Sequence, residues 1–220
     1  MNAVSFLSRP SLRTFMVIST VALGLFAVNS AGAGDGGGKF TLSGNSRVVV
    51  GGVGRFGAAV DLTSNCDNQI LSDCINNFTF STSDVDFTPK GTLTVSDITT
   101  LSTDYNFGAG NCGQESPRIE IRSGTSVLVC APLGSAPTFT NCSLGWLNTG
   151  NWANTADTTI RWDNRCVGIQ NLDWSGVLSN YGSQTVTEID VMLDGGELFP
   201  QGQDLTIDNF TVNQSVLDLF

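Results

Sequence analysis

The sequence has 220 residues, among them 10 Lys and Arg, 20 Asp and Glu and no His, which gives a formal net charge of −10 at pH 7. This acidic balance argues against nucleic acid and anionic lipid headgroups as partners, because both are bound through patches of Lys and Arg. The absence of His excludes Ser-His-Asp and Cys-His catalytic couples and His-ligated zinc, so any acid-base chemistry would fall to Asp, Glu, Tyr or Lys.

The first 33 residues have the features of a secretory signal peptide. A basic segment precedes an apolar stretch of fourteen residues, 15–28, and Ala31 and Ala33 then form a small-x-small cleavage pattern. This stretch is shorter than the roughly 20 residues that span a bilayer. We therefore predict that residues 1–33 are removed and that the protein is secreted, extracellular or periplasmic, without membrane insertion.

The exported part is predicted to be a flexible Gly-rich leader, 34–39, followed by a single domain, 40–220. Short apolar-polar alternations separated by Gly, Asn, Asp, Ser and Pro predict an all-β antiparallel sandwich of jelly-roll type. In chain order, strands are expected at 39–44, 47–51, 57–64, 77–81, 91–98, 118–122, 126–130, 158–162, 185–193 and 205–213.

One segment, "NLDWSGVLSNYG" (171–182), has a helical pattern instead. Its apolar side chains recur at spacings of three and four residues, Asp173 can cap the N-terminus, and Gly182 can end the helix. We predict one short helix there, crossing between strands.

Six cysteines in the exported part predict three disulfides. Short loops and hairpin geometry favour Cys66 with Cys74, and Cys142 with either Cys112 or Cys130. The spacings contain no C-x-x-C pair, so a zinc site is not favoured. The full set is Cys66, Cys74, Cys112, Cys130, Cys142 and Cys166.

The segment "RIEIR" alternates charge with Ile. Because alternate residues of a strand share one face, the two Ile should point to the core, and Arg118, Glu120 and Arg122 should form a polar row on the other face. The segment "TEIDVML" places Glu188 and Asp190 on one face in the same way. If these strands share a sheet, the row is either a solvated face with ion pairs or a shallow groove for a polar ligand. In a hydrolase, Glu120, Glu188 and Asp190 would be the catalytic carboxylates.

Four tryptophans cluster in the second half of the chain. Trp162 lies between an Ile and a Cys and is expected to be buried, as is usual for Trp in a sandwich. Trp146 and Trp152 lie in a Gly- and Asn-rich segment and are expected to be exposed, where a sugar ring could stack on them. The predicted ligand-binding set is therefore Arg118, Glu120, Arg122, Trp146 and Trp152.

Two segments resemble known families. The ending "IDNFTVN" after "LDGG" resembles the closing strand of jelly-roll carbohydrate-binding modules, and this resemblance implies that Asp208 could help to hold a structural calcium against the first strand. The segment 101–121, followed by "WLNTGN", resembles an uncharacterised family of secreted bacterial proteins with a C-G-G-G-S-P-R-F segment. This second resemblance implies an exported sandwich and no particular chemistry, and Gln114 and Glu115 stand where that family has glycines.

Together these patterns predict a secreted binding or surface-interaction module, with a polysaccharide or cell-surface glycan as the most plausible ligand. The alternatives are a glycan-active hydrolase or lyase that uses the paired carboxylates, and a structural exported protein without a small ligand. No cofactor is expected apart from the possible structural calcium.

Overall fold

The computed structural model describes residues 27–28, 37–50, 58–64, 82–109, 116–133, 145–159, 162–163, 166, 171–194, 203–217 and 219. Strands within this part of the chain pair antiparallel throughout, and one α-helix accompanies them. The predicted all-β antiparallel fold class is confirmed, whereas the jelly-roll type stays a prediction.

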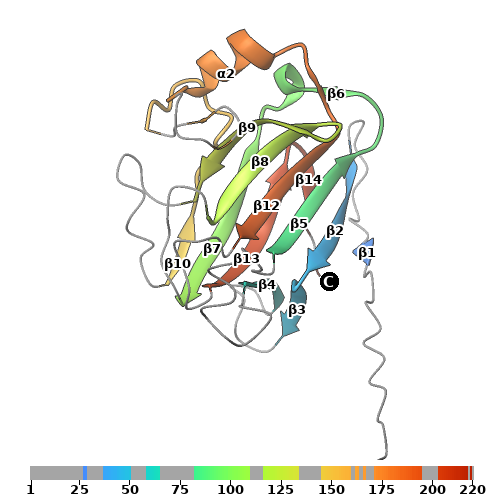
Figure 1. The fold of residues 1–220 in the computed structure, drawn as a ribbon, viewed down its shortest axis with the longest axis vertical. Helices are drawn as coiled ribbons and strands as arrows, with labels where there is room; N and C mark the ends of the chain where they lie inside the picture. The colour runs from blue at the N-terminus through green and yellow to red at the C-terminus, as the bar shows by residue number, and fades with distance from the viewer. Residues whose placement is uncertain are drawn as a thin grey trace, which may run out of the picture.

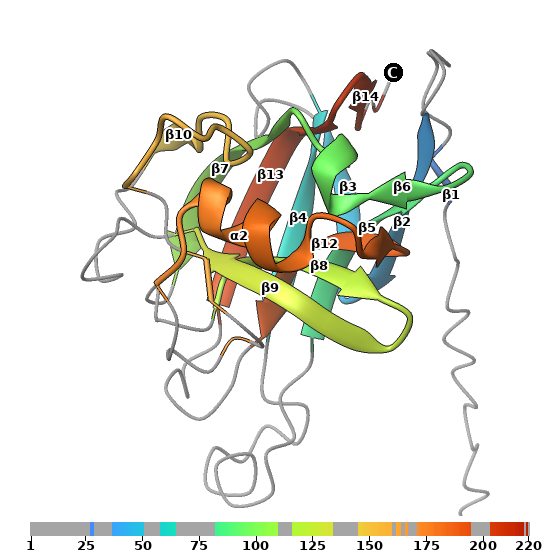
Figure 2. The same ribbon diagram turned by 90° about the horizontal axis from the view of Figure 1, so that it is seen from above.

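Two large sheets lie face to face (Figures 1 and 2). The front sheet has the order β1 (Ala27–Val28), β2 (Gly38–Gly44), β5 (Thr82–Pro89), β12 (Glu188–Asp194), β8 (Arg118–Ser123), β9 (Ser126–Pro132). The back sheet has the order β10 (Trp146–Asn148), β7 (Leu101–Ala109), β13 (Gln203–Val212), β4 (Ala58–Ser64), β3 (Arg47–Val50), with β14 (Ser215–Val216) paired to β13.

The core lies between these sheets and follows from strand alternation. The apolar residues of β5, β8 and β12 alternate with polar ones, and those that face the core are at most 1% exposed. The aromatic rings of Phe40 on β2 and Phe210 on β13 meet across the interface with centroids 5.5 Å apart. The front sheet contributes Phe40, Val85, Phe87, Ile119, Ile121, Ile189, Val191 and Leu193, and the back sheet Val60, Leu62, Tyr105, Phe107, Leu205, Ile207 and Phe210.

One end of the sandwich is covered by the helix α2 (Trp174–Tyr181), the 3-10 turn η1 (Val95–Asp97) and a small sheet of β6 (Leu93–Thr94) and β11 (Thr185–Val186) (Figure 1). The predicted helix is confirmed, with its N-cap at Asp173 and its C-cap at Gly182.

Several predicted boundaries are wrong. The strand expected at 91–98 turns into η1 after two residues, and the strand expected at 185–193 is interrupted at Thr187. β2 begins at Gly38, one residue before the strand expected at 39–44. The prediction missed β5, β7 and β10 altogether, and the strand expected at 77–81 lies outside the described residues.

The structure contains a disulfide between Cys130 and Cys166, whose Cα atoms are 5.5 Å apart. The alternative pairing of Cys142 with Cys130 is therefore wrong. The backbone explains why: Cys130 on β9 exchanges two hydrogen bonds with Asp163, which brings the residue three positions later over the front sheet. Short loop length did not predict this disulfide pairing, because Cys130 and Cys166 are 36 residues apart in the sequence. The other four cysteines lie outside the described residues.

β1 lies within the predicted signal peptide, so cleavage at Ala33 would leave β2 at the edge of the front sheet. Among the described residues, none of the helices has the length and hydropathy of a membrane span. Most of the predicted apolar stretch at 15–28 lies outside that part.

Candidate functional site

The outer face of the front sheet carries charged side chains in register on three neighbouring strands. Asp190 on the central strand β12 is paired with Asp86 of β5 on one side and with Glu120 of β8 on the other. Glu188, two residues before Asp190, is paired with Arg122 of β8. We call this surface the charged face; it comprises Asp84, Asp86, Arg118, Glu120, Arg122, Glu188 and Asp190.

Glu120 lies at the centre of an ion-pair network. Arg118 Nε donates to its Oε1 at 2.5 Å, and Arg122 donates from Nη2 to its Oε2. Arg122 Nε also donates to Asp190 Oδ2 at 2.6 Å and lies 3.8 Å from Glu188 Oε1. The two arginines are thus held in fixed positions by carboxylates from two strands.

The predicted polar row of Arg118, Glu120 and Arg122 is confirmed as one face, and Glu188 and Asp190 lie beside it in the same sheet. The expectation that this face is fully solvated is, however, wrong for Glu120 and Asp190. The side chains of Glu120 and Asp190 are each only 2% exposed. The Cys166 sulfur lies 3.7 Å from Glu120 Oε1, so the disulfide loop helps to remove that carboxylate from water.

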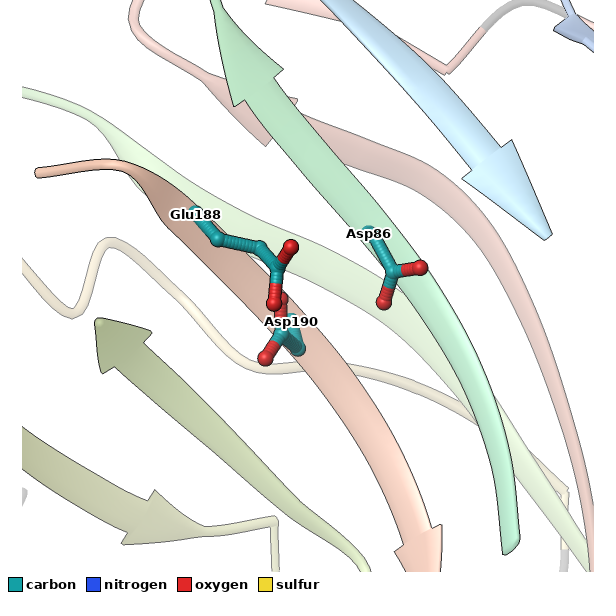
Figure 3. Close-up of side chains that lie close together, drawn as sticks. All are labelled: Asp86, Glu188 and Asp190. Atoms are coloured by element: carbon teal, nitrogen blue, oxygen red, sulfur yellow. The ribbon is translucent and has the colours of Figure 1, made fainter. Parts of the chain in front are cut away.

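Asp86, Glu188 and Asp190 form an acidic triad at the edge of this network (Figure 3). Each offers one carboxylate oxygen, and these oxygens lie within 4.8 Å of one another. Burial, followed by repulsion from neighbouring carboxylates, raises the pKa of Asp86 to about 7 and that of Asp190 to about 9. Both shifts favour the protonated carboxyl group, although Arg122 opposes part of each.

Two carboxylate oxygens on the charged face have no hydrogen-bond partner among the described residues: Asp84 Oδ1 and Asp190 Oδ1. Burial also raises the pKa of Asp84, although the Ser43 hydroxyl donates to its other oxygen at 2.9 Å. Buried polar atoms are nearly always hydrogen-bonded in proteins, so these two atoms are unusual.

Asp84 and Asp86 were missed at the sequence level because β5 was missed. The signal was present in "TSDVDFTP", where Ser83, Val85 and Phe87 are buried and the two Asp alternate with them. Asp and Pro are typical turn residues, and they concealed the period-two pattern of this strand.

The tryptophans do not join this site. Trp152 is only 4% exposed, so its predicted exposure is wrong. Its ring packs edge-on against Trp162 with centroids 6.0 Å apart, and its Nε1 donates to the Thr149 carbonyl at 3.1 Å. Trp146 is half-buried on β10, an edge strand of the back sheet. The predicted ligand-binding set is thus divided between two sheets, while the predicted burial of Trp162 is confirmed.

Asp208 lies on the back sheet, paired with Asp104 of β7. It is buried, and its Oδ1 accepts from the Asn209 backbone N–H at 2.8 Å. Among the described residues, the groups of three possible metal ligands do not include it, and the acidic triad is the group found. A calcium ion at Asp208 stays a prediction from resemblance.

The side chains of the charged face lie close enough together to support two kinds of interaction with a ligand. Its carboxylates can accept hydrogen bonds from hydroxyl groups while its guanidiniums donate, and Glu188, whose side chain is 39% exposed, is open to a ligand. Its acidic triad can also hold a proton or a cation between strands β5 and β12. Comparison with known proteins adds no family: no protein-family model matches the chain, and no curated protein is found to be similar to it.

Proposed function

We propose that the protein is a secreted binding module that recognises a hydroxyl-rich ligand, a glycan, on the charged face. The observation that carries this proposal is the buried Glu120, which fixes two arginines at the surface of a sheet. Preorganised polar groups of this kind bind polar ligands with little loss of side-chain entropy. The predicted signal peptide and the Cys130–Cys166 disulfide support the exported location.

The ligand would meet the more accessible members of the face. Glu188 and Arg122 are 39% and 23% exposed, whereas Glu120 and Asp190 are each 2% exposed, and Asp86 is half-buried next to them. The guanidinium would donate to ring or hydroxyl oxygens, and the two carboxylates would accept from hydroxyl groups. Glu120 would act only as a positioning residue, because both its oxygens are already occupied by Arg118 and Arg122.

A glycan-array screen of the purified full chain, in calcium and in chelator, tests this proposal. We expect specific signals that fall at least about tenfold in Glu188→Gln, since one hydrogen bond to a charged group contributes about 1.5–3 kcal/mol. Trp146→Ala, on the other sheet, is the matched control and should bind as well as the wild type. A blank array with folded protein, or a loss confined to Trp146→Ala, would contradict the proposal.

The acidic triad also favours a second candidate, a glycan-active hydrolase or lyase. Asp190, whose pKa is raised to about 9 and whose carboxyl oxygen lies within 4.8 Å of two other carboxyl groups, has the raised pKa that a general acid needs. An enzyme should release reducing ends or unsaturated products from a bound polysaccharide, and Glu188→Gln should abolish that release. Binding without product excludes this candidate, and the absence of both binding and product would leave a structural role.

A further inference from the structure

We propose that Asp86, Glu188 and Asp190 bind a calcium ion on the charged face. The proposal concerns a cation and does not depend on whether the ligand of this face is a glycan. It also differs from the calcium that resemblance implies at Asp208, which lies on the other sheet.

The geometry of the acidic triad matches the size of the ion. Calcium binds oxygen ligands at about 2.3–2.6 Å, so two ligands on opposite sides of the ion lie up to about 5 Å apart. The three carboxylate oxygens lie within 4.8 Å of one another. They come from adjacent strands, because Asp86 is paired with Asp190, and Glu188 precedes Asp190 by two residues on the same face. Figure 3 shows the carboxyl groups of Glu188 and Asp190 pointing toward one another, with that of Asp86 across from them.

A second observation points to a ligand. The Asp190 side chain is only 2% exposed, and its Oδ1 has no hydrogen-bond partner among the described residues, whereas Oδ2 is occupied by Arg122. A buried carboxylate oxygen without a partner is destabilising, because it has lost water and gained nothing in return. A cation coordinated by the triad would supply that partner.

The excess of negative charge on this face also favours a bound cation. Six carboxylates, of Asp84, Asp86, Glu120, Glu188, Asp190 and Asp194, interact electrostatically with two guanidiniums among the described residues, those of Arg118 and Arg122. Both Glu120 oxygens are held by these arginines, whereas Asp86 forms no ion pair with any described residue.

The donor set favours calcium over other metals. It consists of carboxylate oxygens alone, the hard ligands that calcium prefers, and it contains no His or Cys, which zinc favours. Magnesium requires a nearly ideal octahedron and gives up its water reluctantly, so it should bind more weakly to ligands that rest on a sheet. Water would complete the coordination on the exposed side, next to Glu188.

Isothermal titration of calcium chloride into the full chain, first stripped with chelator, tests the proposal. We expect one site per chain, weaker binding of magnesium, and at least about tenfold weaker calcium binding in Glu188→Gln. Glu188 is 39% exposed, so this variant should fold. The matched control is Asp194→Asn on the same strand, because the Asp194 side chain is 38% exposed, lies 3.6 Å from Arg118 as an ion pair, and is outside the triad. It should bind calcium as the wild type does.

Three results would overturn the inference: no calcium binding by folded wild-type chain, equal weakening in both variants, or loss of binding in Asp208→Asn with Glu188→Gln unaffected. The last result would move the ion to the back sheet. The glycan proposal fails separately, because a blank array would leave the calcium titration unchanged, and a missing calcium site would leave glycan binding in chelator unchanged.

Discussion

At the residue scale, Glu120 is a side chain whose replacement should clearly lower the stability of the protein. It is a buried carboxylate that holds two guanidiniums at once. Replacing it with Ala leaves both arginines partly desolvated without their shared partner, and breaking a buried ion pair in this way typically costs about 3–5 kcal/mol. We therefore expect Glu120→Ala to lower the free energy of unfolding by about 3 kcal/mol in urea titrations.

Glu120→Gln is the control, because it keeps the shape and one acceptor oxygen, and it should lose clearly less stability. A change below about 0.5 kcal/mol in Glu120→Ala, as for an ordinary surface substitution, would contradict the positioning role. The pair of variants also tests the enzyme alternative. A catalytic Glu120 would lose its activity in Glu120→Gln while the protein stayed stable.

Strand alternation predicted which face each of these side chains occupies, but it could not predict their burial. The burial of Glu120 depends on Cys166, which a disulfide brings over β8 from a distant part of the chain. Trp152 shows the same limit. Its surroundings of Gly and Asn indicated a solvated loop, yet its ring completes a buried cluster with Trp162 and Trp174. Local sequence carries no information about such distant partners.

At the scale of elements, the helix α2 depends on its N-cap. Asp173 Oδ1 accepts from the Gly176 backbone N–H and from the Ser175 hydroxyl, each at 2.8 Å. We expect Asp173→Ala to destabilise the protein by about 1 kcal/mol, and Asp173→Asn to retain most of the stability. Because the helix buries Trp174 and Val177, near-ultraviolet circular dichroism during urea unfolding should report the loss. Identical midpoints for the Ala variant and the wild type would show that the cap contributes nothing.

The helix was predictable because its cap, its apolar spacing and its final glycine all agree. The prediction of a strand at 91–98 was wrong for a local reason that can be seen in the sequence. Asp97 Oδ2 accepts from both the backbone N–H and the hydroxyl of Thr94, and this capping closes a 3-10 turn in place of a strand. β5 was missed for the opposite reason, since its turn-forming Asp residues are held in a strand by pairing with β2 and β12.

At the scale of the whole molecule, the sequence predicted the fold class but not the order of the strands. Alternation shows which side chains share a face of one strand, whereas the charged face requires β12 to lie between β5 and β8. These three strands are distant in the chain, and their pairing is decided by the packing of the core. Alternation in β8 and β12 therefore identified five of the seven residues of the charged face, whereas Asp84 and Asp86 on β5, the latter a member of the triad, were missed.

The back sheet gives the molecule a pH dependence that does not involve the charged face. Burial, followed by a hydrogen bond and repulsion from Asp61, raises the pKa of Asp204 to about 6, although Arg47 partly opposes the shift. The folded chain therefore keeps a proton that the unfolded chain, with an ordinary Asp pKa near 4, has already released. Stability from this group is complete below pH 4 and is lost as the pH rises through about 6.

We therefore expect the free energy of unfolding to fall by on the order of 1–2 kcal/mol between pH 4 and pH 7 because of Asp204, with allowance for its partial exposure. Asp204→Asn cannot titrate and should flatten this part of the curve. Urea unfolding of both proteins in chelator isolates the effect, because Asp84, Asp86 and Asp190 have pKa values raised in the same direction and contribute equally to both curves. Parallel curves would mean that Asp204 titrates alike in the folded and unfolded chains, and that Asp61 and Arg47 leave its carboxyl group in an essentially aqueous environment.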